Sequence, residues 1–69
     1  MSGRKVNNHS KFGRLINERG LRLYDVCHGT RIGYARLGEY INLRRPWSSK
    51  DLRIVAEFFD VEPEDLIGV

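Results

Sequence analysis

The stretch over residues 23–42, LYDVCHGTRIGYARLGEYIN, constrains the fold more than any other part of the chain. Its apolar residues fall twice into the i, i+3, i+4 spacing that places side chains on one face of a helix. They are Leu23, Val26 and Cys27 before a short break and Tyr34, Leu37 and Ile41 after it, with Tyr40 beside the second set. The break is too short for an ordinary linker, so two short helices joined by a tight turn are predicted.

The residues of the break favour such a turn. Gly29 can adopt the positive φ that ends many helices, and the apolar Ile32 is expected to fill the angle between the two helices. Two helices that meet through a Gly-containing turn of three or four residues form a helix-turn-helix unit. The second helix then turns one face outward, made of Tyr34, Ala35, Arg36, Glu39 and Asn42.

The segment before this unit predicts another helix. Ser10 can cap its first turn, and Gly20 lies just past its expected end near Arg19. Its apolar stripe is Phe12, Leu15 and Ile16. Residues 1–9 are polar and lack periodicity, so they are predicted to form a flexible basic arm.

The third helix is expected over residues 33–43, with Gly33 as its cap and Pro46 shortly beyond its end. Gly38 inside this helix costs about 1 kcal/mol relative to Ala. A cost of that size points either to close packing between helices or to close approach of a ligand's backbone.

The last third of the chain predicts two more helices. Ser48 and Asp51 have the spacing of a capping box at the start of a fourth helix, which Val61 closes. Pro63 is expected at the first position of a short fifth helix. The sequence therefore predicts an all-α fold, a compact five-helix domain over residues 10–69.

Charge is divided sharply along the chain. Residues 1–53 hold all twelve Lys and Arg and four acids, a net charge of +8, whereas residues 54–69 hold five acids and no base, a net charge of −5. Such a chain can turn a basic side toward a polyanion and keep its acidic side away. Together with the helix-turn-helix pattern, this separation favours nucleic acid over a surface whose charges are divided by chance.

Other function classes find little support in the residues. Cys27 is the single cysteine, which agrees with a reducing, cytoplasmic setting, and it is expected to pack in the core. His9 and His28 lie far apart and join no Cys or carboxylate cluster, so no metal site and no cofactor are predicted. No catalytic constellation of Ser, His, Asp or Cys is recognised, and no apolar run approaches the ~20 residues of a membrane span.

Residues 12–67 resemble the lambda repressor/Cro-type helix-turn-helix family. The segments that carry the resemblance are FGRLINERG, LYDVC, TRIGYARLGEYIN, RRP and LRIVAEFFDVEPEDLIG. The resemblance implies a small phage- or prophage-type transcriptional regulator, a repressor or a Cro-like protein, that inserts its third helix into the major groove of double-stranded DNA. The chain departs from the family at Arg22 and Leu23, where Ser-Gln is frequent, and at Arg31, where the turn usually has Gly.

Two classes of DNA contact are expected. Base edges are assigned to Tyr34, Ala35, Arg36 and Glu39, and phosphates to Lys11, Arg14, Arg31, Asn42, Arg44, Arg45 and Trp47. Arg36 can hold guanine O6 and N7, Glu39 can accept from cytosine N4, and Ala35 can pack on a thymine methyl group. Core packing is an alternative for Tyr34 and Trp47, and Glu39 can instead pair with Arg36 or Arg45.

The expected partners include a second copy of the chain. A homodimer would read two half-sites about 34 Å apart, and Leu66, Ile67 and Val69 are its candidate surface, unless they complete the core. The alternative function is an antirepressor-like module that binds another regulator protein through the helix-turn-helix face. A steep loss of affinity with salt distinguishes DNA binding from such a contact.

Overall fold

A computed structural model gives the fold of residue 6 and residues 8–69. This part of the chain contains α1 (Lys11–Glu18), α2 (Leu23–Thr30), α3 (Tyr34–Ile41) and α4 (Ser49–Phe59), and no strand. The all-α prediction is confirmed. The predicted short fifth helix is the 3₁₀ turn η1 (Pro63–Asp65), which begins at Pro63 as predicted. It ends where Leu66 returns to the core, so this part of the chain has four α-helices and not five.

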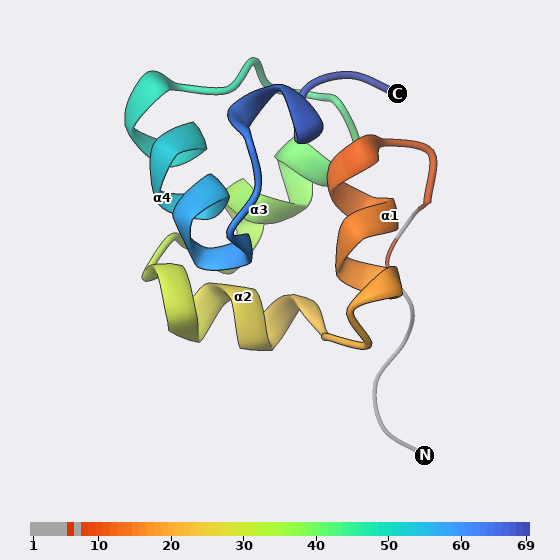
Figure 1. Cartoon of the computed structure of the whole chain (residues 1–69), viewed down its shortest axis with the longest axis vertical. Coiled ribbons are helices and arrows are strands. Elements are labelled where there is room, and N and C mark those ends of the chain that lie inside the picture. The colour runs from red at the N-terminus through yellow and green to blue at the C-terminus, as the bar shows by residue number, and fades with distance from the viewer. Residues whose placement is uncertain (1–5, 7) are drawn as a thin grey trace.

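The helices pack so that α2 covers one end of the molecule (Figure 1). It contacts both α3 and α4, while α1 packs on α3 and η1 packs on α4. The C-terminal end returns to the start of α1, where the Lys11 backbone N–H donates to the Gly68 carbonyl at 3.0 Å. The two ends of the domain are thereby joined.

Little of the predicted basic arm falls within the described part of the chain. Its charged residues, Arg4 and Lys5, lie outside the described residues. Val6 exchanges two hydrogen bonds with the Asn17 side chain of α1, at 2.9 and 3.3 Å, and packs against the core. At this residue the chain is therefore held to α1.

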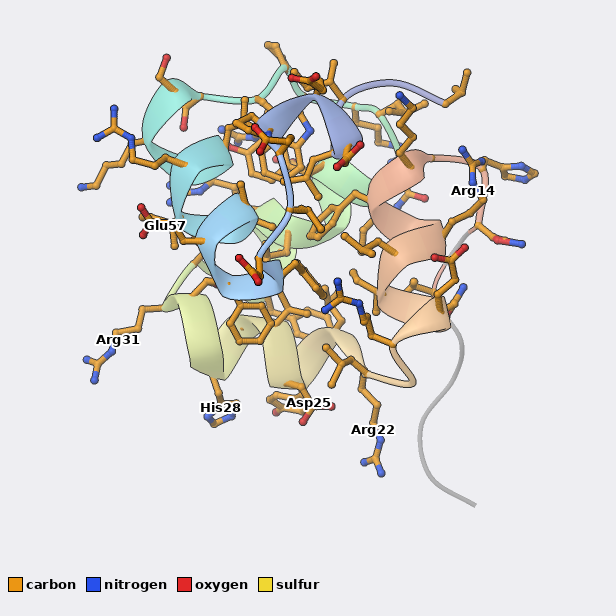
Figure 2. The ribbon with its side chains drawn as sticks, in the orientation of Figure 1. Arg14, Arg22, Asp25, His28, Arg31 and Glu57 are labelled. Carbon is orange, nitrogen blue, oxygen red and sulfur yellow. The ribbon has the colours of Figure 1, made fainter. Side chains whose placement is uncertain are left out.

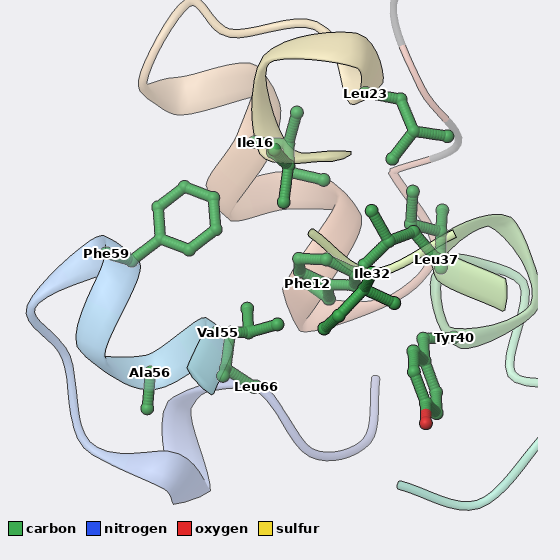
Figure 3. Close-up of a cluster of buried hydrophobic side chains, with 12 residues drawn as sticks. Phe12, Ile16, Leu23, Ile32, Leu37, Tyr40, Val55, Ala56, Phe59 and Leu66 are labelled. Carbon is green, nitrogen blue, oxygen red and sulfur yellow. The ribbon is translucent and has the colours of Figure 1, made fainter. Parts of the chain in front are cut away.

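One hydrophobic core draws on every helix (Figure 3). Its buried members are Phe12, Ile16, Leu23, Val26, Ile32, Leu37, Tyr40, Ile41, Val55, Ala56, Phe59 and Leu66. Ile32 is only 2% exposed, as expected of an apolar turn residue. Cys27 packs against this core and is partly buried.

The apolar stripe of α3 differs from the predicted one. Tyr40 is 1% exposed and takes the core position, whereas Tyr34 is 54% exposed. Tyr34 is the first residue of α3, and helical side chains lean toward the N-terminus of their helix. Its ring therefore extends past the core and meets the ring of Tyr24 on α2, with centroids 5.6 Å apart.

The predicted helix caps are present. Ser10 Oγ accepts from the Gly13 N–H and Ser48 Oγ accepts from the Asp51 N–H, both at 3.1 Å. Gly33 caps α3 through its backbone conformation, without a side-chain hydrogen bond. The predicted starts of α1, α3 and α4 therefore hold to within one residue.

Each helix ends before a residue with positive φ, and three of these four residues are not glycine. They are Gly20, Arg31, Leu43 and Asp60. The prediction that Gly20 lies just past the end of α1 is confirmed. The prediction that Gly29 ends its helix is wrong, because α2 continues to Thr30 and Arg31 adopts φ +63°. The predicted third helix also ends early, at Ile41, because Leu43 turns left-handed before Pro46 is reached.

Gly29 has a different role, which depends on α4. A Cβ atom on Gly29 would lie 2.1 Å from the ring of Phe58, so the missing side chain permits close packing of α2 on α4. Among the described residues, none outside the adjoining part of α3 lies within 4 Å of a Cβ atom placed on Gly38. Helix packing within the chain therefore explains Gly29 and does not explain Gly38.

Replacing Arg31 with Gly tests the strain at the end of α2. An L-residue in the left-handed conformation costs about 1–2 kcal/mol, partly offset by the freedom of Gly in the unfolded chain, so Arg31→Gly should raise the free energy of unfolding by about 0.5–1 kcal/mol. Urea unfolding followed by circular dichroism measures it. Arg31→Ala, which removes the same charge and keeps Cβ, is the control; equal stability of the two variants would contradict strain at this residue.

The two helical glycines should respond in opposite ways to alanine. Gly38→Ala should raise the free energy of unfolding by about 1 kcal/mol, because it improves helix propensity in open space. Gly29→Ala should lower it, because displacing Phe58 costs about 1–3 kcal/mol and exceeds the same helical gain. Thermal unfolding of both variants measures the contrast, and a stabilised Gly29→Ala protein would contradict the assigned contact.

Candidate nucleic-acid interface

The outward face of α3 is flat at its centre. Leu37, Tyr40 and Ile41 face the core, which leaves Ala35 and Gly38 on the other side of the helix. Because these residues carry little or no side chain, a partner can approach the backbone of α3 closely. The exposed Asn42, whose amide donates to the Gly38 carbonyl at 3.0 Å, lies at the C-terminal end of this face.

Glu39 borders this face and is paired. Its Oε1 lies 2.6 Å from Arg45 Nε, and both side chains are nearly half exposed. The hydrogen bond from Arg45 to Glu39 and the charge of Glu39 raise the pKa of Arg45 above its ordinary value. Of the two pairings predicted for Glu39, the structure shows the one with Arg45, which offsets the negative charge beside α3.

Arg36 lies at the side of α3 that faces α4. Its guanidinium contacts the Asp51 carboxylate, with Nε 3.0 Å from Oδ2 and Nη2 3.3 Å from Oδ1. The Asp51 side chain is 6% exposed, and its Oδ2 also accepts from the Tyr40 hydroxyl at 2.5 Å. The Asp51 carboxylate of the predicted capping box thus faces α3, whereas its backbone N–H is capped by Ser48.

An aromatic cluster adjoins the start of α3. The Tyr24 ring lies edge to face with Tyr34 and 5.5 Å from the His28 ring, and Tyr24 is 64% exposed. Sequence reasoning missed Tyr24 and His28. Their signal is positional, since both lie on the side of α2 opposite its apolar stripe.

Figure 2 shows which labelled side chains share the outer edge of α2. Those pointing away from the body of the molecule there are Arg22, Asp25, His28 and Arg31. Asp25 also accepts from the Arg22 backbone N–H at 2.9 Å and so caps the start of α2. Arg22 and Arg31 therefore place a positive charge at each end of this helix.

Lys11 and Arg14 are engaged elsewhere. Lys11 Nζ donates to the Glu64 carbonyl at 3.4 Å, and Arg14 Nη2 donates to the Val69 carbonyl at 2.8 Å. Arg14 and Arg31 lie on opposite sides of the molecule in Figure 2. The structure therefore holds Lys11 and Arg14, two of the predicted phosphate contacts, at the C-terminal end of the chain.

Trp47, another predicted phosphate contact, packs at the edge of the core. Its indole stacks on Tyr40 with centroids 4.0 Å apart and meets Phe12 edge to face at 5.1 Å. The side chain is half-buried. Trp47 therefore lies where the alternative prediction placed it, packed at the junction of α3 and α4.

The predicted dimer surface is reduced by one residue. Leu66 is 1% exposed and completes the core, whereas Ile67 and Val69 are exposed. A hollow of about 510 Å³ beside them is lined in part by Leu43, Trp47 and Ile67. Apolar surface at this end of the domain therefore includes the loop that follows α3.

Comparison with known protein families, with curated proteins and with solved structures gave no match to this chain. Within the described residues, no helix has the length and apolar character needed to cross a membrane.

The two ion pairs beside α3 should differ in their effect on stability. Arg36→Met should lower the free energy of unfolding by about 1–2 kcal/mol, because the buried Asp51 carboxylate loses its opposite charge. Glu39→Gln should leave the thermal midpoint almost unchanged, because that pair is exposed. Differential scanning calorimetry measures both, and equal midpoints for the two variants would contradict a structural role for the Arg36 pair.

Proposed function

We propose that the protein is a sequence-specific DNA-binding transcriptional regulator, a repressor or a Cro-like protein, in which α2, residues 31–33 and α3 act as a helix-turn-helix unit. The observation that carries the proposal is the outward face of α3. The centre of this face is formed by Ala35 and Gly38, whose small size lets the helix approach the base edges at the floor of a DNA groove. The opposite face is held in the core by Leu37 and Ile41, so α3 can enter the major groove as a rigid element.

The charges support DNA as the ligand. Arg22 and Arg31 lie at the two ends of α2, and Arg44 and Arg45 follow α3 in exposed positions. The acidic residues of the C-terminal segment lie at the end of α4 and around η1, outside the helix-turn-helix unit itself. The phosphate contacts proposed beside α3 therefore come from basic residues of α2 and of the loop after α3, and such contacts supply most of the non-specific affinity.

Base readout is assigned to Ala35, in the flat centre of α3, and to Glu39, which borders that centre. Ala35 is suited to the methyl group of thymine, and Glu39 to the amino group of cytosine. Arg45 reduces the repulsion between Glu39 and nearby phosphates, because the two side chains are paired. No contact with another described residue explains Gly38, which is consistent with close approach of DNA at that residue.

A homodimer on an inverted repeat fits the small size of the domain. One module buries about 600–1,000 Å² on DNA, which is little for specific affinity. The exposed Ile67 and Val69, together with Leu43, which lines the same hollow as Ile67, offer an apolar surface to a second copy at one end of the domain. Two copies so joined would read half-sites about one helical turn apart.

A protein partner is the second candidate, and the exposed Tyr24–Tyr34 pair favours it. Tyr is enriched at binding hot spots between proteins, and this pair borders the face assigned to DNA. In this alternative, the face binds another regulator protein, as an antirepressor does. Selection from a randomised duplex library at about 50 and 200 mM salt separates the candidates, since counterion release makes only DNA binding fall steeply with salt.

Removal of one phosphate contact should change the salt dependence and leave base preference intact. Arg44→Ala should weaken binding to all duplexes alike and lower the slope of log K against log salt by about one unit. Fluorescence anisotropy at several salt concentrations measures the slope.

Arg53→Ala is the charge-matched control. Arg53 is exposed on α4, two residues beyond the buried Asp51 and so on a different side of that helix. Its removal should leave the slope close to that of the parent protein. A changed base preference in Arg44→Ala, or equal slopes for the two variants, would contradict the assignment of Arg44 as a phosphate contact.

A further inference from the structure

The pair of Arg36 and Asp51 uses only one edge of the guanidinium. Arg36 faces the carboxylate through Nε and Nη2, at 3.0 and 3.3 Å. A guanidinium presents five N–H donors in a fixed, planar fork. The opposite edge, formed by Nη1 and the second N–H of Nη2, has no hydrogen-bond partner among residue 6 and residues 8–69. A second bidentate contact therefore remains available to this side chain.

The carboxylate that holds Arg36 is itself fixed. Tyr40 donates a short hydrogen bond to Asp51 Oδ2, and the Tyr40 ring is stacked on Trp47. The backbone N–H of Asp51 is bonded to Ser48, in the first turn of α4, where the helix dipole stabilises a negative charge. Asp51 is therefore a rigid support, attached to α3 and α4 together.

The Arg36 side chain is accessible although it is held. It is 46% exposed, against 6% for Asp51, and it belongs to the first turn of α3, the part of a recognition helix that contacts base edges. Its rotamer freedom is restricted on folding, so less entropy is lost when it binds a ligand. A long, flexible side chain is thereby converted into a fixed donor pair.

We infer that Asp51 is a positioning residue that presents the outer edge of Arg36 to guanine. Two parallel N–H donors match O6 and N7 of guanine in the major groove, the commonest specific contact to this base. This inference rests on the proposed function and deepens it, since it assigns a G·C base pair within each half-site. The assignment to guanine, rather than to a phosphate, is what the experiment decides.

The test replaces single guanines in the selected operator with 7-deazaguanine, which lacks the N7 acceptor and keeps Watson–Crick pairing. At one guanine of each half-site, the parent protein should lose about tenfold in affinity, within the range expected for one base contact. Arg36→Lys keeps the charge but has no planar fork that can face Asp51 and guanine together, so it should lose most of the discrimination between the two duplexes. Asp51→Asn should lose most of the discrimination while its salt slope stays unchanged.

Tyr40→Phe is the matched control for a merely structural role of Asp51. It removes one hydrogen bond from the same carboxylate and leaves the Arg36 contact in place. Because the Ser48 cap and the Arg36 pair still hold Asp51, it should lower stability and keep most of the tenfold discrimination at temperatures where circular dichroism shows a folded protein. If Asp51→Asn does not fold, the comparison of the parent protein with Arg36→Lys carries the test of the guanine contact.

The outcomes separate this inference from the proposed function. Specific DNA binding without sensitivity to any 7-deazaguanine would overturn the guanine contact and leave the DNA-binding function in place. Equal loss of discrimination in Asp51→Asn and Tyr40→Phe would overturn the positioning role. Absence of any retained duplex would overturn the proposed function, and the guanine assignment with it.

Discussion

The buried carboxylate of Asp51 is the constraint on which the orientation of α3 depends. A charge removed from water is tolerated only where an opposite charge and hydrogen-bond donors satisfy it. Asp51 lies in the first turn of α4, and α3 supplies both of its side-chain partners, Arg36 and Tyr40. Rotation of α3 about its axis would break both contacts and move Tyr40 off Trp47. The same interaction thereby determines that Ala35 and Gly38 face outward.

Much of the fold could be predicted from local pattern. Apolar spacing located all four helices, and Ser10, Ser48 and Gly20 marked ends that the structure confirms, because caps and left-handed glycines act over three or four residues. The fifth helix could not be predicted in this way, since its length depends on where Leu66 meets the core. Gly29 was likewise misread, because its neighbour Phe58 is distant in sequence and only tertiary packing brings them together.

The candidate site was predicted less completely than the fold. The outward position of Ala35 follows from helical spacing. The Glu39–Arg45 pair does not, because Arg45 lies in the loop beyond the end of α3. Helical spacing does not predict that Tyr40 is buried and Tyr34 exposed, because both residues fit an apolar stripe. The contacts of Tyr40 with Asp51 and Trp47 decide which of the two is in the core. The exposed Tyr24 was missed, since its only signal in the sequence is its position off the apolar stripe of α2, and its contact with Tyr34 on α3 is known only from the structure.

The most direct test of the central proposal is an NMR titration of the isotope-labelled protein with a duplex selected from the random library. If α3 enters the major groove, the amides of Ala35, Gly38 and Asn42 should show the largest shifts. Intermolecular contacts from the Ala35 methyl group to base protons should accompany those shifts. The amides at the end of α4 and around η1 should shift little. Shifts confined to α4 and η1, or to the C-terminal end alone, would contradict the account.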